Sequence, residues 1–181
     1  RLGSSFIFPA AARLRQGSGL GLRSCSALAA MAAVKKEVMD LVAKLGKKDE
    51  AQGALEAIAT MAAEKGSAAE PFLVGVLDKI FEAASDKSKN VAVAAVAASK
   101  AIVDVMSPFA IDAAMPNLLS GLAVKAKPQT KEATLNAITA IAEKSPKAIG
   151  YALVTLCSPV AELTCDIKKE VKAAALACMT A

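Results

Sequence analysis

The 181-residue sequence contains no histidine and no tryptophan, and only 3% of its residues are aromatic. Without histidine, the chain lacks the commonest general base, the commonest metal ligand and the side chain that titrates near neutral pH. Its four cysteines form no CxxC pair, and Cys157, Cys165 and Cys178 lie in apolar helical contexts that favour buried structural positions. We therefore predict no catalytic, metal-binding or cofactor-binding residues, and no enzymatic activity for this chain.

A long hydrophobic segment is also absent. The longest uncharged stretch, Ala148 to Ala161, is shorter than the roughly 20 residues that a membrane-spanning helix needs, and it contains Gly150 and Pro159. Apolar residues nevertheless make up 55% of the sequence and charged residues only 22%, which is too apolar for a disordered chain. The sequence therefore predicts a folded domain with a core of small aliphatic side chains and no contact with a membrane.

Acidic residues are missing from the first 33 residues, which contain all four arginines of the chain. An acid-free leader that carries arginine and serine is typical of organelle transit peptides. The sequence begins with Arg1, however, and Met31 is a natural start just before a regular helical pattern at Val34. Residues 1–33 are therefore interpreted as a transit peptide, a disordered leader or untranslated upstream sequence, and residues 34–181 as the folded part of a longer protein.

A repeat of about forty residues runs through this folded part. Leu55, Val96, Leu135 and Leu176 follow one another at steps of 41, 39 and 41 residues. Apolar residues of the first copy, Leu55, Ile58, Ala59 and Ala62, fall at i, i+3, i+4 and i+7, and Leu135, Ile138 and Ala142 repeat that stripe, which predicts helices. Three further columns keep the same frame, and each joins residues of similar size: Ala54, Ala95, Thr134 and Ala175; Ala57, Ala98, Ala137 and Cys178; Met61, Ile102 and Ile141.

Each copy is predicted to contain two helices. The first helices are expected at about Pro71–Ala84, Pro108–Val124 and Lys147–Thr164, with the hydroxyls of Ser107 and Ser145 as caps. One helical pair cannot bury its apolar face alone, so neighbouring pairs must stack, and this period is typical of HEAT and armadillo repeats. We predict an all-α, HEAT/armadillo-type α-solenoid of about four antiparallel helix pairs in a right-handed superhelix. Six residues are expected to be buried between its layers: Leu55, Val96, Ile102, Leu135, Ile141 and Leu176.

Three blocks of the sequence stand out beside the repeat: Ser107–Leu118 (SPFAIDAAMPNL), Asp166–Ala175 (DIKKEVKAAA) and Met179-Thr180. They resemble the N-terminal HEAT-repeat region of the translation elongation factor 3 family, the ribosome-bound ABC-type ATPases of fungi and some algae. The resemblance covers Glu70 to Ala181 well and the residues from 46 to 65 more loosely. Cys165 stands where the family has tryptophan, and this difference implies local repacking within the same fold.

The resemblance implies a parent protein that uses ATP to assist ribosomal translocation and the release of deacylated tRNA from the exit site. In the family, this activity lies in two ATP-binding cassettes downstream of the HEAT repeats. The present sequence contains no GxxxxGK[ST] phosphate loop. ATP is therefore expected as a cofactor of the parent's cassettes, with no cofactor in this chain.

Lysines recur at the predicted turns between the two helices of a pair, or just after them. Equivalent turns of a solenoid lie along one edge, so these lysines would form a basic ridge suited to phosphate contacts without base readout. Acidic neighbours such as Asp86, Asp166 and Glu170 dilute this charge, and the alternative interpretation is that the lysines solvate exposed turns. The candidate contacts with ribosomal RNA are Lys87, Lys89, Lys125, Lys127, Lys131, Lys168, Lys169 and Lys172.

The repeat, the lysines and the resemblance together predict a ribosome-binding HEAT module of an elongation factor 3-like translation factor. The expected partners are ribosomal RNA and ribosomal proteins, with no small-molecule substrate, and the chain is expected to be monomeric and cytoplasmic. A plastid or mitochondrial location is the alternative if residues 1–33 are a transit peptide. The rival function is a general HEAT/armadillo scaffold that binds protein partners on its concave face.

Overall fold

The structure is a computed structural model, and it describes residues 20–47 and 50–181. All regular elements in these residues are helical, and two of them are short 3₁₀ turns, Gly66–Ala68 and Pro108–Ala110. The α-helices, in chain order, are α1 (Leu20–Leu45), α2 (Ala51–Lys65), α3 (Glu70–Val74), α4 (Leu77–Ala83), α5 (Lys89–Val105), α6 (Ile111–Leu122), α7 (Pro128–Lys144), α8 (Pro146–Leu163) and α9 (Lys169–Thr180).

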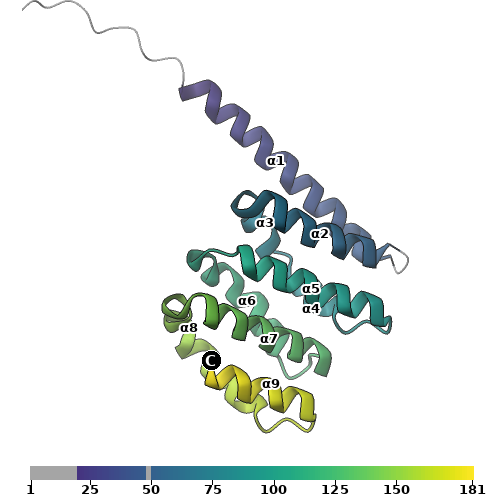
Figure 1. Cartoon of the computed structure of the whole chain (residues 1–181), viewed down its shortest axis with the longest axis vertical. Helices are drawn as coiled ribbons and strands as arrows, with labels where there is room; N and C mark the ends of the chain where they lie inside the picture. Colours follow the sequence, from purple (N-terminus) through teal and green to yellow (C-terminus); the bar gives the residue numbers. More distant parts are fainter. Residues whose placement is uncertain (1–19, 48–49) are drawn as a thin grey trace, which may run out of the picture.

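The helices form two layers of a stack (Figure 1). The second helices of the pairs, α2, α5, α7 and α9, contact one another in order and form one layer, while α4, α6 and α8 form the other. Each helix of the α2 layer also packs against its own partner, which gives the pairs α1–α2, α4–α5, α6–α7 and α8–α9. The described residues therefore confirm the predicted all-α solenoid of stacked helix pairs.

The hydrophobic core lies between the two layers and runs along the stack. Four residues of the predicted columns, Leu55, Ile102, Leu135 and Ile141, are at most 2% exposed. Small side chains occupy the column next to Leu55 and Leu135, and all of them are buried, so the helices can approach closely there. These small residues are Ala54, Ala95, Thr134 and Ala175.

Two of the six predicted core residues are not buried. Val96 is 45% exposed and Leu176 is 50% exposed, although they share a repeat position with Leu55. Val96 lines a hollow between α5 and α7, so no side chain of α7 covers it fully. Leu176 belongs to α9, the last helix that the structure describes.

The first helix starts earlier than the predicted domain boundary at Val34, because α1 begins at Leu20. The helix therefore extends into the segment that the sequence assigned to a leader, and the many alanines and leucines of residues 20–33 favour a helix. Residues 29–33 are exposed, whereas Val38 is 1% exposed. The first half of α1 accordingly extends beyond the stack (Figure 1). The predictions for residues 1–19 lie outside the described residues.

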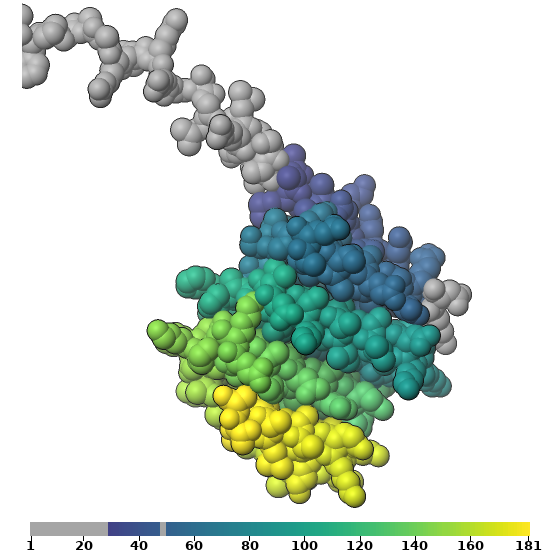
Figure 2. All heavy atoms as spheres, viewed as in Figure 1, coloured from purple at the N-terminus to yellow at the C-terminus, as the bar shows by residue number. Residues whose placement is uncertain are grey.

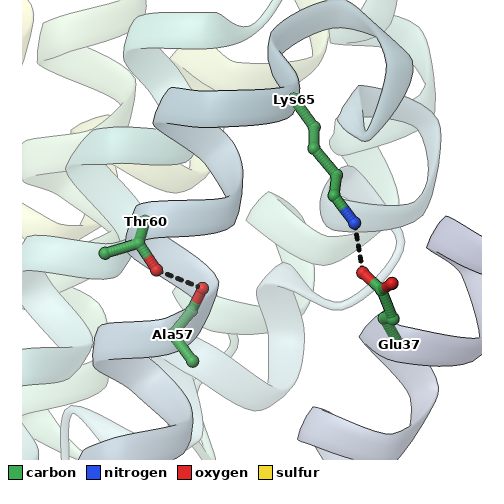
Figure 3. A network of polar contacts seen from close by, with 4 residues as sticks. All are labelled: Glu37, Ala57, Thr60 and Lys65. Carbon is green, nitrogen blue, oxygen red and sulfur yellow. Dashed lines mark hydrogen bonds and ion pairs between the residues drawn. The ribbon is translucent and has the colours of Figure 1, made fainter.

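The second half of α1 packs against α2, and an ion pair joins the two helices. The Lys65 ammonium at the end of α2 donates to the Glu37 carboxylate on α1 (Figure 3). Both side chains are partly exposed, so this pair contributes little to stability. The other bond in this view, from Thr60 Oγ1 to the carbonyl oxygen of Ala57 at 2.9 Å, is local to α2. Apolar packing around Val38 therefore holds α1 on the stack.

Prolines mark the start of three helical segments, at Pro108, Pro128 and Pro146, where the missing N–H and fixed φ of proline suit the first turn. The predicted capping bonds are wrong, because neither the Ser107 nor the Ser145 hydroxyl caps its helix. The Ser107 backbone N–H instead donates to Glu70 Oε1 at 2.7 Å. A side chain of the preceding pair therefore anchors the entry to α6.

The predicted helix Pro71–Ala84 is interrupted between α3, which ends at Val74, and α4, which begins at Leu77. Asn117 on α6 donates from Nδ2 to the carbonyl oxygen of Val74 at 2.7 Å. The last carbonyls of a helix have no partner within the helix, and this bond satisfies one of them. A polar side chain of the next pair thus stabilises the break.

Gly121 on α6 and Thr134 on α7 mark a close approach of the two helices. A Cβ atom at Gly121 would lie 2.2 Å from Thr134 Oγ1 and 3.1 Å from its Cβ. The Thr134 side chain cannot turn away easily, because it is fully buried and its hydroxyl donates to the carbonyl oxygen of Thr130 at 2.8 Å. A larger residue at position 121 must therefore push α6 and α7 apart.

We expect Gly121→Ala to lower the free energy of unfolding by about 1–3 kcal/mol, the usual effect of overpacking, measured by urea denaturation. Gly150→Ala on α8 is the matched control, since a Cβ there meets nothing within 4 Å. That helical substitution should stabilise by up to about 1 kcal/mol, because alanine has the higher helix propensity. Equal effects at the two positions would contradict the close contact between Gly121 and Thr134. In a Thr134→Ala background, Gly121→Ala should cost less, because most of the contacting side chain is gone.

Candidate nucleic-acid interface

The loops that join the two helices of each pair lie along one edge of the stack, on the right in Figure 1. Three of them are described in full: residues 84–88, 123–127 and 164–168. Ser85 of the first loop lines the same hollow as Lys125 and Lys127 of the second. A bond from Lys131 to Asp166 joins the start of α7 to the third loop. The structure therefore brings the three loops together in the order that the repeat predicts.

Seven of the eight candidate lysines are exposed on this edge. The loops and the first helical turns that follow them contain two exposed acidic residues, Asp86 and Glu170. The exposed charge of this part of the described chain is therefore positive. We call these seven lysines the basic edge: Lys87, Lys89, Lys125, Lys127, Lys168, Lys169 and Lys172.

Lys131 is the exception, and the expectation that it lies free on this edge is wrong. The residue is 8% exposed, and its Nζ lies 3.2 Å from Oδ2 of Asp166 in the next pair. Its place in the first turn of α7 directs the side chain toward the following loop. A buried ammonium needs such a partner, because an unpaired buried charge is strongly destabilising. The same pair neutralises Asp166, which therefore does not dilute the basic edge.

Asp86 and Asp166 shape the first and third loops. Asp86 Oδ1 accepts a bond from the backbone N–H of Ser88 at 2.8 Å, and Asp166 Oδ1 accepts one from the N–H of Lys168 at 3.0 Å. Such aspartate turns fix the backbone just before a helix begins. In the second loop the equivalent residue is Lys125, which adds a further cation. The turns thus hold the lysines at the N-terminal ends of α5 and α9.

The Asp166 carboxyl, on the third loop of this edge, makes the stability of the fold depend on pH. The Lys168 N–H and then the Lys131 ammonium hold its pKa below the usual value. A carboxyl with a lowered pKa in the folded state stabilises the fold above its unfolded pKa of about 3.9, and this stabilisation is lost as the pH falls through the folded pKa. The contribution of Asp166 is therefore present at neutral pH and absent in strong acid.

We expect Asp166→Asn to be less stable than the parent chain at pH 7, and this difference to shrink as the pH falls below about 4. Urea denaturation of both proteins at a series of pH values measures it. In a Lys131→Met background the difference should be smaller, since one of the two groups that favour the carboxylate is gone. If the difference in the free energy of unfolding between the two proteins did not change with pH, the charge of Asp166 would not contribute to stability.

Side-chain bonds between neighbouring pairs complete the site, and the sequence pattern did not reveal them. Thr130 on α7 donates to the carbonyl oxygen of Phe81 at 3.1 Å. Lys144 donates from Nζ to the carbonyl oxygens of Val103 and Met106, at 2.9 and 3.0 Å, and so caps the end of α5. Together with the bonds of Glu70 and Asn117, these contacts fix how one pair sits on the next. They therefore set the spacing of the loops on the basic edge.

Other kinds of site are not supported by the described residues. In residues 20–47 and 50–181, no group of three or more cysteine and acidic side chains could hold a metal ion. The prediction of buried cysteines is wrong for Cys157 and Cys165, which are exposed, while partial burial raises the pKa of the Cys178 thiol. No single described helix is long and apolar enough to cross a membrane, and α5 and the segment Pro108–Leu122 pass that test only as a pair bent by 116°.

The stacked helix pairs, with polar bonds between pairs and loops along one edge, define a HEAT-repeat module. Comparison with known families gives the particular one: the EF3 N-terminal HEAT repeat family matches residues 18–179. This match covers most of the chain, so the chain belongs to that family. It also includes the whole of α1, in agreement with the helix that begins at Leu20.

Curated relatives are similar over most of this chain and a small part of their own length. Elongation factor 3 of Zygosaccharomyces rouxii is 37% identical over 135 residues, which are 74% of this chain and 13% of the relative. Elongation factor 3 of Candida albicans is 32% identical over 149 residues, which are 81% of this chain and 14% of the relative. The mRNA export factor elf1 of Schizosaccharomyces pombe is 29% identical over 130 residues, which are 71% of this chain and 12% of the relative.

Proposed function

We propose that this chain is a ribosome-binding module of an elongation factor 3-like translation factor, and that its basic edge contacts ribosomal RNA. The observation that carries the proposal is that seven exposed lysines lie on successive loops, or in the first helical turns after them, and these loops follow one edge of the stack. Membership of the EF3 N-terminal HEAT repeat family supports the ribosome as the partner. The module would act by positioning the rest of the protein.

The chemistry of the edge suits the phosphate backbone. Lysine carries a compact charge on a flexible stem, so it can follow phosphates without a fixed geometry. The three loops contain no aromatic residue on which a base could stack. Affinity would come from the release of counterions as lysines neutralise phosphates, which requires no particular base sequence.

The activity of the whole protein is part of the same proposal. The relatives are about seven to eight times as long as the region they share with this chain, since that region is 12–14% of their length. By family membership, the parent would use ATP in cassettes outside residues 1–181 to assist translocation and exit-site tRNA release. It would work in the cytoplasm, and this chain would contribute docking without binding ATP itself.

The test is binding of the purified chain to purified ribosomes by co-sedimentation at low salt, for the parent chain and for a triple reversal, Lys127→Glu, Lys168→Glu and Lys169→Glu. We expect saturable binding by the parent and strongly reduced binding by the triple reversal. No binding by the parent chain would overturn the ribosome proposal. Equal binding by the two proteins would show that another surface makes the contact.

A further inference from the structure

A hollow of about 470 Å³ opens between the first and second loops of the basic edge. It is lined by α4, by the end of α6, by the second loop and by Thr130 at the start of α7. Figure 2 shows the edge itself, where the α4–α5 pair in teal lies next to the α6–α7 pair in green. The volume is within the range of about 300–1,000 Å³ that is typical of small-molecule sites. We call this space the edge hollow.

Contacts between the helix pairs hold the walls of the edge hollow in place. The Thr130 hydroxyl donates to the carbonyl oxygen of the buried Phe81 at 3.1 Å, which ties the start of α7 to α4. Gly121, another lining residue, lies at the close approach of α6 to Thr134 on α7. The hollow is therefore preformed, and little conformational freedom is lost when a ligand enters it.

Two carboxylates and two ammonium groups line the edge hollow, and none of the four forms an ion pair with another described residue. Asp78 and Glu82 are four residues apart on α4, so they lie on one face of that helix. Asp78 Oδ1 accepts a bond from the N–H of Lys79 at 2.7 Å, which leaves its second oxygen for another donor. Lys125 and Lys127 belong to the second loop. The hollow thus offers hydrogen-bond acceptors on one wall and cations on another.

The repeat explains why Lys125 has no ion-pair partner among the described residues. Lys125 has the repeat position of Asp166, and Ala92 has the repeat position of Lys131. The ion pair that joins α7 to the third loop therefore has no counterpart one helix pair earlier. The ammonium of Lys125 is accordingly available to an external anion.

A nucleotide combines the groups that these two walls would bind. Its phosphate is an anion, and a carboxylate accepts two N–H bonds side by side. Guanine is the RNA base whose Watson–Crick edge presents two adjacent donors, the N1–H and the N2 amino group. Adenine and cytosine present an acceptor nitrogen beside their amino group, and uracil presents one N–H between two carbonyl oxygens. Unstacked RNA bases are read on this edge, and a carboxylate there favours guanine.

We propose that the edge hollow binds one unstacked guanine nucleotide, with its base on Asp78 and Glu82 and its phosphate on the two lysines of the second loop. This inference rests on the proposed contact of the basic edge with RNA. It adds selectivity for a base to phosphate contacts that have none by themselves. The hydroxyls of Ser85 and Ser120 also line the hollow, and either can bond the 2′-OH of the ribose.

The probes are four fluorescein-labelled RNA nonamers of uridine, whose central residue is guanosine, inosine, adenosine or uridine. Fluorescence anisotropy at 50 mM salt measures their binding to the whole chain. We expect the guanosine RNA to bind about tenfold more tightly than the adenosine and uridine RNAs, the effect of one bidentate contact to a base. Inosine lacks the N2 amino group, so its RNA should bind with an intermediate affinity.

A double variant of the α4 wall tests the location. Asp78→Asn with Glu82→Gln should reduce the preference for guanosine over adenosine to about twofold or less. Loss of two negative charges strengthens the binding of every RNA, so the ratio of the two affinities is the readout. Asp112→Asn with Glu162→Gln is the matched control, because it removes the same charge from exposed positions of α6 and α8 outside the hollow. The control should keep the tenfold ratio, and circular dichroism should show both variants folded.

Equal binding of the four RNAs by the parent chain would overturn the inference and leave the phosphate contacts of the basic edge in place. A preference for guanosine that survives in the α4 variant, or that falls equally in the control, would overturn it as well. Failure of the proposed function gives a different result, a parent chain that binds neither ribosomes nor any of the four RNAs, and that result would overturn both.

Discussion

Replacing Leu135 by alanine lowers the free energy of unfolding by about 2–5 kcal/mol, the range for a buried leucine that leaves a cavity. Leu135 is fully buried, and it lies on α7, which packs against α5, α6, α8 and α9. Each helix pair of a solenoid is stabilised mainly by its neighbours, so a cavity between central pairs weakens several contacts at once. Urea denaturation followed by circular dichroism measures the loss.

Leu176→Ala is the matched control for this prediction. Leu176 has the same position in the repeat on α9, but it is 50% exposed. Its truncation removes less buried area, and we expect a loss below about 1 kcal/mol. Equal losses at the two positions, or a loss under about 0.5 kcal/mol for Leu135→Ala, would contradict the packing described for α7.

Reversing three lysines of the basic edge has the second large expected effect. We expect Lys127→Glu, Lys168→Glu and Lys169→Glu together to weaken ribosome binding by roughly a hundredfold or more at 50 mM salt, and only several-fold near 0.5 M salt. Each lysine in contact with a phosphate releases counterions, and this contribution grows as the salt concentration falls. Binding titrations with purified ribosomes at several salt concentrations measure the effect.

The same reversal should leave the fold intact. Lys127 and Lys168 are N-cap residues of α7 and α9, and Lys169 is the first residue of α9. Acidic residues at helix N-termini are favoured by the helix dipole, so the three glutamates should not destabilise the chain. The control is the reversal of three exposed lysines elsewhere, Lys79, Lys100 and Lys147, which changes the net charge equally. If the control weakened binding as much, total charge would matter and the edge would not.

The fold could be predicted from the sequence because the residues that specify it recur about every forty positions. Columns such as Ala54, Ala95, Thr134 and Ala175 keep small residues where the two layers meet, and the structure buries all four. The same period placed the lysines at equivalent loops along one edge. Val96 and Leu176 show the limit of this reasoning, since a period identifies a position and does not identify the neighbour that covers it.

The polar contacts between pairs could not be predicted for a related reason. Lys131 and Asp166 are 35 residues apart in sequence, and nothing in either local pattern indicates that they meet. The bonds of Asn117 and Lys144 likewise reach backbone atoms 43 and about 40 residues away, which any residue type could provide. Such contacts depend on the relative rotation of neighbouring pairs, and a pattern of apolar residues specifies that rotation only coarsely.

The central claim is that the basic edge binds the ribosome through phosphate contacts. Its most direct measurement is the slope of the logarithm of the ribosome association constant against the logarithm of salt concentration, for the parent chain and for the triple reversal at Lys127, Lys168 and Lys169. Each lost phosphate contact should reduce the magnitude of the slope by about 0.7–0.9, so the reversal should reduce it by about 2–3. A slope that is the same in both proteins would contradict the claim.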